Sequence, residues 1–306
     1  MRTDFYYDSC GGGRIHGCRW TPNGPVEAVV QIIHGIAERV ERYDEFAQYL
    51  NERGILVVAE DHMGHGQSVE ADGTLGFFEG GWNAAVDDSY HLLETTRAEF
   101  PEQPYLLFGH SMGSFMARSL LIRYPDSGIT HAVICGTGWI SAPMLSVGLS
   151  VARSTAKRLG EKTPSEKLHK LVFGGYNKRV EHPRTEFDWL SRDCRIVDEY
   201  IADPLCGFME TSGLLRDMLG GMAFNQKKSN LERMDKELPV LFIAGGDDPV
   251  GNYGSGVRQC AQSFRDSGMK KVECRIFPLG RHEILNEINR EEIYDTVYHW
   301  FKKMCG

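Results

Sequence analysis

Ser111 is the residue whose surroundings most clearly indicate chemistry. It lies at the centre of the segment 109–113, with the sequence G-H-S-M-G, after an apolar stretch, Tyr105–Phe108, and before a helical pattern. In a G-x-S-x-G turn between a strand and a helix, the serine backbone is strained and its hydroxyl is exposed. The flanking glycines remove side chains that would collide across the turn. We therefore predict that Ser111 is a nucleophile rather than an incidental serine in a glycine-rich turn.

A serine hydroxyl needs a base, and the base needs an acid to orient it. After a nucleophile of this kind the acid follows a later strand, and the histidine comes last. The predicted strand Val240–Ala244 is followed by Gly-Gly and then by Asp247 and Asp248. We favour Asp248, because the strand end and turn take up about three residues before a side chain can point toward the serine. Asp247 stays as the alternative, and whichever is not used would cap a turn or helix.

His282 is the only histidine in the loop after the last predicted strand, Val272–Phe277. Asp248 would hold its imidazole in the tautomer that accepts the Ser111 proton. The backbone amides of Met112 and Ile36 are the predicted donors for a developing oxyanion, because one follows the nucleophile and the other follows an earlier strand.

Four other histidines lie near these motifs. We expect His34 to brace its loop, and His110 to pack within the turn rather than take part in catalysis. The segment Glu60–Ser68 contains His62 and His65, which suggests a metal site, but no third ligand is evident and a structured loop is favoured.

Alternating strands and helices position these residues. Apolar runs with short connections predict a mostly parallel sheet covered by helices on both faces. After the sixth strand the alternation stops, and helical patterns continue to about Gln226. We predict a core of residues 1–138 and 227–306, with a helical cap, residues 139–226, over the strand ends where ligands bind. The predicted strands are Phe5–Asp8, Arg14–Trp20, Val26–Ile33, Ile55–Ala59, Tyr105–Phe108, His131–Cys135, Val240–Ala244 and Val272–Phe277.

Composition narrows the class of protein. The chain has 306 residues and a formal charge of −8, which disfavours nucleic-acid binding. It shows no signal peptide and no apolar run of transmembrane length. Its eight cysteines are scattered without a CxxC pair, so we expect free thiols, a cytoplasmic location and no structural zinc site. No cofactor or metal is expected, since a serine, an acid, a histidine and two amides suffice for acyl transfer.

Together these motifs resemble the monoacylglycerol lipase and lysophospholipase-like branch of the α/β-hydrolases. The branch carries H-G-x-x-E, D-x-x-G-H-G-x-S, G-H-S-M-G, G-x-x-D and a late histidine. In this chain they are His34–Glu38, Asp61–Ser68, Gly109–Gly113, Gly245–Asp248 and His282. The resemblance implies the α/β-hydrolase fold. It also supports Asp248 over Asp247, and the Ile36 and Met112 amides as the oxyanion hole.

The resemblance implies hydrolysis of carboxylic esters such as monoacylglycerols or lysophospholipids through an acyl-enzyme on Ser111. An aminopeptidase, thioesterase or amidase on the same fold is the alternative. A peptidase would need an acidic pocket for a free amine, and the acids that could supply it are Glu38, Glu186, Asp188, Asp193 and Asp198. A non-catalytic binding protein is disfavoured by the intact triad. We expect a small acyl ester as the binding partner and no stable insertion into a membrane. Transient contact with lipid through the cap, and a homodimer, are both compatible with the sequence. Apolar residues that could line an acyl tunnel are Met144, Leu145, Val147, Leu149, Phe173, Trp189, Phe208, Met209, Leu214, Leu215, Met218 and Phe224.

Overall fold

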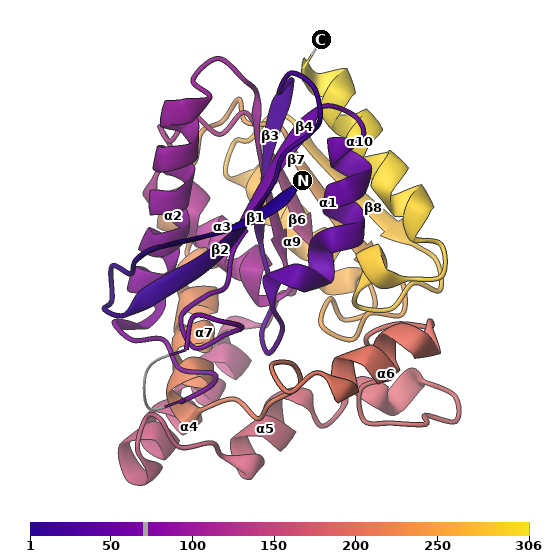
Figure 1. Ribbon diagram of the computed structural model, residues 1–306. Helices are drawn as coiled ribbons and strands as arrows, with labels where there is room; N and C mark the ends of the chain where they lie inside the picture. The colour runs from indigo at the N-terminus through magenta and orange to yellow at the C-terminus, as the bar shows by residue number, and fades with distance from the viewer. Residues whose placement is uncertain (70–72, 306) are drawn as a thin grey trace.

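The computed structural model describes residues 1–69 and 73–305, which form one eight-stranded sheet flanked by helices (Figure 1). All eight predicted strands are present, with small shifts at their ends. The strands are β1 (Arg2–Asp8), β2 (Arg14–Trp20), β3 (Ala28–Ile33), β4 (Ile55–Glu60), β5 (Tyr105–His110), β6 (His131–Cys135), β7 (Val240–Gly245) and β8 (Val272–Phe277).

The sheet order is β1-β2-β4-β3-β5-β6-β7-β8. β1 pairs antiparallel with β2, and β2 pairs antiparallel with β4, whereas every later pair is parallel. The central strands β3 to β7 are buried along their full length, which explains their largely apolar sequences. The predicted mostly parallel sheet is therefore confirmed.

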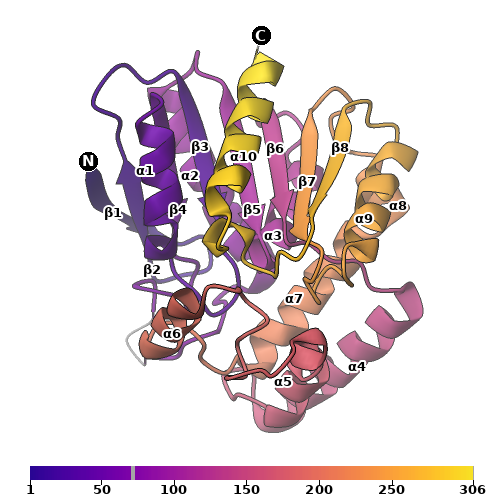
Figure 2. The ribbon, with the colours of Figure 1, turned by 90° about the vertical axis from the view of Figure 1, so that its right-hand side faces the viewer.

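Helices cover both faces of the sheet. Figure 2 shows α1 and α10 on one face and α2, α3 and α9 on the other. Each face has its own apolar cluster, one including Phe46, Phe108 and Trp300, the other including Phe115, Phe242 and Phe264. These helices are α1 (Asp44–Asn51), α2 (Gly81–Glu99), α3 (Met112–Arg123), α9 (Ser255–Asp266) and α10 (Arg290–Cys305).

A helical insertion joins β6 to β7 and lies below the carboxyl ends of the parallel strands (Figures 1 and 2). Its inner helix, α7, packs against α2, α3 and α4, so the insertion and the core share one apolar cluster. The predicted position of a helical insertion after the sixth strand is confirmed. Its elements are α4 (Ala142–Leu159), α5 (Glu166–Phe173), η2 (Tyr176–Arg179), α6 (Cys194–Ala202), α7 (Ser212–Asn225) and α8 (Lys228–Leu231).

Two helices begin at residues set by local turns. Asn83 is a residue type that commonly caps a helix, but α2 begins before it, at Gly81, after Gly80 in the left-handed conformation. Apolar residues recur at helical spacing from Val40 to Leu50, and the structure divides this stretch between a 3-10 turn, η1 (Val40–Tyr43), and α1. In both cases the apolar spacing gave the helix face, whereas glycine conformation and tight turns set the first residue.

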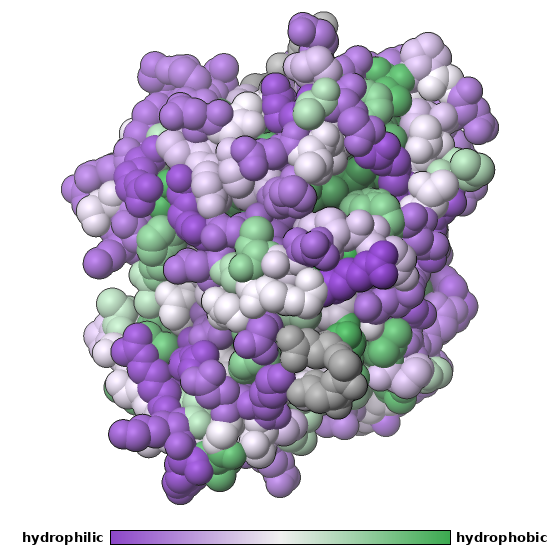
Figure 3. Space-filling model, turned by 60° about the vertical axis from the view of Figure 1, so that its left-hand side comes forward, coloured by the Kyte–Doolittle hydropathy of each residue, from purple (hydrophilic) through white to green (hydrophobic). Residues whose placement is uncertain are grey.

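The face of the molecule seen in Figure 3 is mostly polar, with apolar side chains in small separate patches. Within residues 1–69 and 73–305, no helix is both long and apolar enough to cross a membrane. The seven cysteines whose side chains are described are free thiols, as the sequence predicted.

Helix α3 approaches the sheet very closely at Gly113. A Cβ placed there would lie 2.0 Å from the Ile33 carbonyl oxygen and 2.4 Å from that of His34, both backbone atoms. We therefore expect Gly113→Ala to lower the free energy of unfolding by about 2 to 3 kcal/mol, because helix and strand must separate. Denaturant unfolding measures this change.

Gly148→Ala in α4 is the matched control, since its Cβ would meet just one atom, 3.8 Å away. There the higher helix propensity of alanine should add about 0.5 to 1 kcal/mol. If Gly113→Ala and Gly148→Ala change the free energy of unfolding equally, α3 does not approach the sheet as closely as described.

Candidate active site

Ser111 occupies a strained turn between β5 and α3. Its φ of 52° and ψ of −121° place a non-glycine residue in a region that L-residues rarely adopt. Its amide donates to the Cys135 carbonyl at 3.0 Å, which ties the turn to the end of β6. A Cβ at Gly109 would lie 2.5 Å from the Gly113 carbonyl oxygen, so this turn requires glycine there. The geometry agrees with the turn predicted from the sequence.

Asp248 and His282 lie together at the ends of β7 and β8. His282 Nδ1 donates to Asp248 Oδ1 at 3.0 Å, and both side chains are buried. The same carboxylate oxygen accepts the Val250 amide at 2.9 Å, which fixes its orientation. Asp247 is exposed in the turn. Of the two competing aspartates, Asp248 is therefore the one that contacts the histidine.

His282 is placed to act as a base. Burial alone would lower its pKa, but the neighbouring Asp248 carboxylate outweighs burial and raises the pKa above 6.5. His110, whose ring centre lies 4.8 Å from that of His282, has its pKa lowered to about 3 by burial and by this neighbour. A neutral His110 packs against His282 within the turn, as expected from the sequence.

The loop after β3 brings Gly35 and Ile36 beside the serine. A Cβ at position 35 would lie 3.0 Å from the Ser111 Cβ, so only glycine allows this approach. Ile36 and Ser111 line one pocket. Among the described residues, the amides of Ile36 and Met112 have no hydrogen-bond acceptor. Two free amides near one hydroxyl are what a developing oxyanion requires.

A buried ion-pair network supports this loop, and the sequence did not reveal it. Glu38 accepts the Gly35 amide at 2.5 Å and the Tyr43 hydroxyl at 3.0 Å. Arg42 bridges Glu38, at 3.1 Å, and Glu283, at 2.5 and 2.6 Å. Burial would raise the pKa of Glu283, but Arg42 lowers it to about 2. Glu38 and Arg42 have helical spacing, whereas Glu283 lies 241 residues from Arg42 along the chain.

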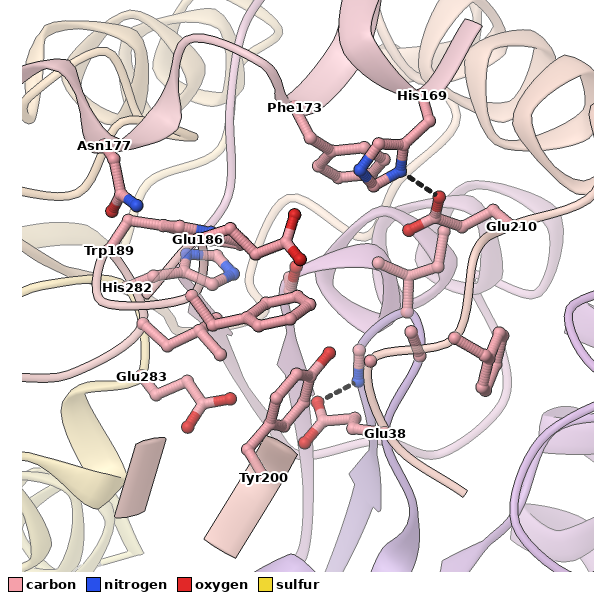
Figure 4. Close-up of a pocket in the computed structure, with 18 of the residues that line it drawn as sticks. Glu38, His169, Phe173, Asn177, Glu186, Trp189, Tyr200, Glu210, His282 and Glu283 are labelled. Carbon is pink, nitrogen blue, oxygen red and sulfur yellow. Dashed lines mark hydrogen bonds and ion pairs between the residues drawn. The ribbon is translucent and has the colours of Figure 1, made fainter. Parts of the chain in front are cut away.

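Ser111 and His282 line a pocket of about 450 Å³ between the sheet and the insertion (Figure 4). This volume suits one small organic ligand. Glu210 hydrogen-bonds His169 at 2.8 Å on one wall, and this contact raises the pKa of that histidine. The Glu186 carboxylate points into the cavity and forms no ion pair or hydrogen bond with another described residue. The apolar lining residues are Ile36, Ala37, Phe173, Phe187, Trp189, Leu190 and Phe208.

The sequence prediction for the pocket lining was mostly wrong. Of the twelve apolar residues proposed for an acyl tunnel, Phe173, Trp189 and Phe208 line the pocket. Most of the others pack into the apolar cluster or are exposed, because helix rotation within the insertion could not be read from its sequence. Of the acids considered, Glu38 and Glu186 line the pocket. Asp188 and Asp198 make contacts within the insertion, and Asp193 contacts both the insertion and Arg290 of the core.

His34 and His62 are structural. His34 Nδ1 donates to the Gly35 carbonyl at 2.7 Å, and its Nε2 accepts the His62 amide at 3.0 Å. Burial lowers the pKa of His62 to about 3 and that of His65 to about 4, so both stay neutral. Asp61 accepts the amides of Val40 and Gln67, each at 2.9 Å. The segment Glu60–Ser68 is the structured loop that we expected.

An eight-stranded, mostly parallel sheet with a strained serine and a paired aspartate and histidine at its carboxyl edge defines an α/β-hydrolase. A family model described as "Serine aminopeptidase, S33" matches residues 24–289. The chain belongs to this family, and its relatives place it in the monoacylglycerol lipase-like branch.

Two relatives and one solved structure illustrate the match. Monoglyceride lipase of Rattus norvegicus is 33% identical over 94% of this chain and 85% of its own length. Monoacylglycerol lipase of Mycolicibacterium smegmatis is 28% identical over 98% of this chain and 96% of its own length. A thermostable carboxyl esterase from Bacillus coagulans, in complex with glycerol, superposes with a TM-score of 0.92 at 28% identity, covering 99% of both chains.

The raised pKa of His282 predicts how activity depends on pH. A base accepts a proton in its neutral form, so kcat/KM for an ester should fall as the pH is lowered through a value above 6.5. Asp248→Asn should lower kcat by roughly 10⁴-fold through loss of the correct tautomer. It should also move the acid limb of the pH–rate profile, where activity falls with falling pH, to lower pH. The reason is that the charge that raises the pKa of His282 is removed. Initial rates across the pH range measure both effects.

Asp247→Asn is the matched control, because Asp247 is the adjacent exposed aspartate. It should leave both the rate and the acid limb unchanged. If the acid limb of the pH–rate profile lies at the same pH in Asp248→Asn and in the wild type, a group other than His282 controls it.

Proposed function

We propose that Ser111, Asp248 and His282 form the catalytic triad of a carboxylic-ester hydrolase. The observation that carries this proposal is the strained Ser111 turn, which faces a pocket shared with His282, itself hydrogen-bonded to Asp248. His282 takes the hydroxyl proton as Ser111 Oγ attacks the ester carbonyl. The same proton passes to the leaving alcohol, and an acyl-enzyme remains on Ser111.

The second half of the reaction uses the same groups. His282 removes a proton from a water molecule, which attacks the acyl carbonyl and releases the acid from Ser111. In both halves the amides of Ile36 and Met112 donate to the oxyanion of the tetrahedral intermediate. Glu38 supports this step by fixing the Gly35 amide, and with it the loop that carries Ile36.

We propose monoacylglycerols and similar small acyl esters as substrates. Aromatic side chains of the insertion suit an acyl chain, and polar groups on the walls suit an alcohol such as glycerol. The lipase and esterase relatives support this choice. We further propose that residues 139–226 act as a cap that selects the substrate, and that the enzyme works in the reducing cytoplasm, which fits its free thiols.

Aminopeptidase activity is the second candidate, and Glu186 is the observation that favours it. A free substrate amine needs an unpaired carboxylate near the serine. Glu38 and Glu283 share Arg42, and Glu210 is bound to His169. Glu186 is the pocket carboxylate without such a partner among the described residues. One exposed carboxylate is a weak amine site, so ester hydrolysis remains the first choice.

A panel of p-nitrophenyl esters of increasing chain length, measured beside aminoacyl p-nitroanilides, tests the substrate class. The wild-type enzyme should turn over the esters with a clear preference for one chain length. Ser111→Ala should lose turnover by roughly 10⁴-fold or more and lose labelling by a fluorophosphonate. A thermal melt shows whether the variant is folded.

Either of two outcomes would overturn the proposal. Preference for the anilides would make the enzyme a peptidase. Fluorophosphonate labelling that survives in Ser111→Ala would place the nucleophile elsewhere.

The outer face of α4 gives the insertion an apolar stripe. Met144, Val147 and Val151 follow at helical spacing and are 69%, 64% and 37% exposed. Exposed apolar side chains at this spacing suit the surface of a lipid aggregate, where an acylglycerol would be collected. We propose that this stripe makes transient contact with lipid.

Met144→Glu combined with Val147→Glu tests the stripe. Hydrolysis of monoacylglycerol presented in vesicles should fall roughly tenfold or more, because two apolar contacts with lipid are lost. Turnover of a soluble short-chain ester should be unchanged. Ile288→Glu, at a residue outside the insertion that is 61% exposed, is the control. An equal loss with the soluble ester, or a dimer that dissociates in the double variant, would contradict lipid contact.

A further inference from the structure

The β1–β2 hairpin brings three metal-ligating side chains together at the edge of the sheet, away from Ser111. Asp4 on β1 pairs directly with Cys18 on β2, and His16 lies two residues from Cys18 on the same strand. Residues two apart on a strand share one face, so all three side chains point the same way. Cys18 and His16 are fully buried, and Asp4 is half exposed.

The three donor atoms already have the spacing of a metal site. Asp4 Oδ1 lies 3.2 Å from His16 Nε2 and 3.2 Å from Cys18 Sγ, and Cys18 Sγ lies 3.9 Å from His16 Nε2. A tetrahedral zinc ion with ordinary bond lengths separates nitrogen from oxygen by about 3.4 Å, and sulfur from either by about 3.5 Å. Each observed distance is within about 0.4 Å of these values.

A neighbouring carboxylate orients the histidine. His16 Nδ1 donates to Asp61 Oδ2 at 2.7 Å, in the buried loop after β4. Metal-bound histidines commonly donate their second nitrogen to a carboxylate in this way, which directs the other nitrogen toward the metal. Asp61 is itself held by the amides of Val40 and Gln67, so the imidazole has a fixed direction.

We propose that Asp4, His16 and Cys18 bind a zinc ion that serves a structural role. The ion lies between the unprotonated His16 Nε2 and Asp4 Oδ1, and the proton of the Cys18 thiol passes to solvent. A water molecule supplies the fourth ligand, because the Gln67 atom that lies 3.3 Å from His16 Nε2 is an amide nitrogen, which does not bind zinc. A thiolate and a carboxylate balance the charge of Zn²⁺.

The positive charge of the nearby Arg2 would repel a bound zinc ion only weakly, because other carboxylates also pair with it. Its guanidinium lies 3.7 Å from Asp4 but donates to Asp44 at 2.9 Å. Bound zinc would fasten the antiparallel hairpin to the loop that begins at Asp61. The sequence prediction of no metal site was based on the missing CxxC pair, which does not reveal ligands that meet across a hairpin.

Zinc titration of the chelator-treated, full-length protein tests the proposal. In competition with a chromophoric chelator, the wild type should bind one zinc ion at this site, and zinc should raise its Tm. Cys18→Ser and Asp4→Asn should each raise the dissociation constant for zinc at least tenfold. Substitution with Co²⁺ should produce the visible absorption of a tetrahedral site, with a thiolate charge-transfer band that Cys18→Ser removes.

Cys194→Ser removes an exposed thiol on α6 and is the matched control, with unchanged affinity expected. If Cys18→Ser does not fold, Asp4→Asn decides, because its carboxylate is half exposed and isosteric replacement leaves the hairpin intact. Absence of stoichiometric zinc binding by the wild type would overturn the proposal. The same holds if affinity is unchanged in both variants, which would mean that these side chains form a hydrogen-bonded cluster alone.

Discussion

The close approach of α3 to the sheet is the constraint on which the active site depends. Glycines at 109 and 113 allow the helix backbone to lie against β3 and β5 with no side chain between them. That contact forces Ser111 into a positive φ and holds its hydroxyl in the pocket. This backbone conformation costs about 1 to 3 kcal/mol, which the burial of the central strands offsets. A rigid sheet thus maintains one unfavourable residue conformation.

The electrostatics around His282 depend on the pairing of buried charges. Asp248 raises the pKa of His282, while burial keeps His110 neutral beside it. Arg42 accommodates two carboxylates, Glu38 and Glu283, that could not both be buried as anions without it. Around His282, the charges of Asp248, Glu38, Arg42 and Glu283 are therefore paired with one another or with the histidine.

The sequence predicted the parts of the structure that depend on local pattern. All strands, the position of the insertion and the Asp248–His282 pair follow from apolar runs and from turn residues adjacent to strands. The pocket lining did not follow, because helix rotation in the insertion depends on packing against α2 and α3. The ion pair of Arg42 with Glu283 and the hairpin cluster around His16 join residues that only the tertiary fold brings together.

The loop that carries His282 is fastened to the insertion by its backbone. The amides of His282 and Glu283 donate to the carbonyls of Trp189 and Leu190, at 3.3 and 2.8 Å. Arg281 donates to the carbonyls of Asp188 and Ser191, at 2.6 and 2.9 Å. Residues 188–191 are therefore held against the His282 loop by four hydrogen bonds. Any movement of these residues would also displace His282, so access to the pocket and the position of this histidine depend on the same contacts.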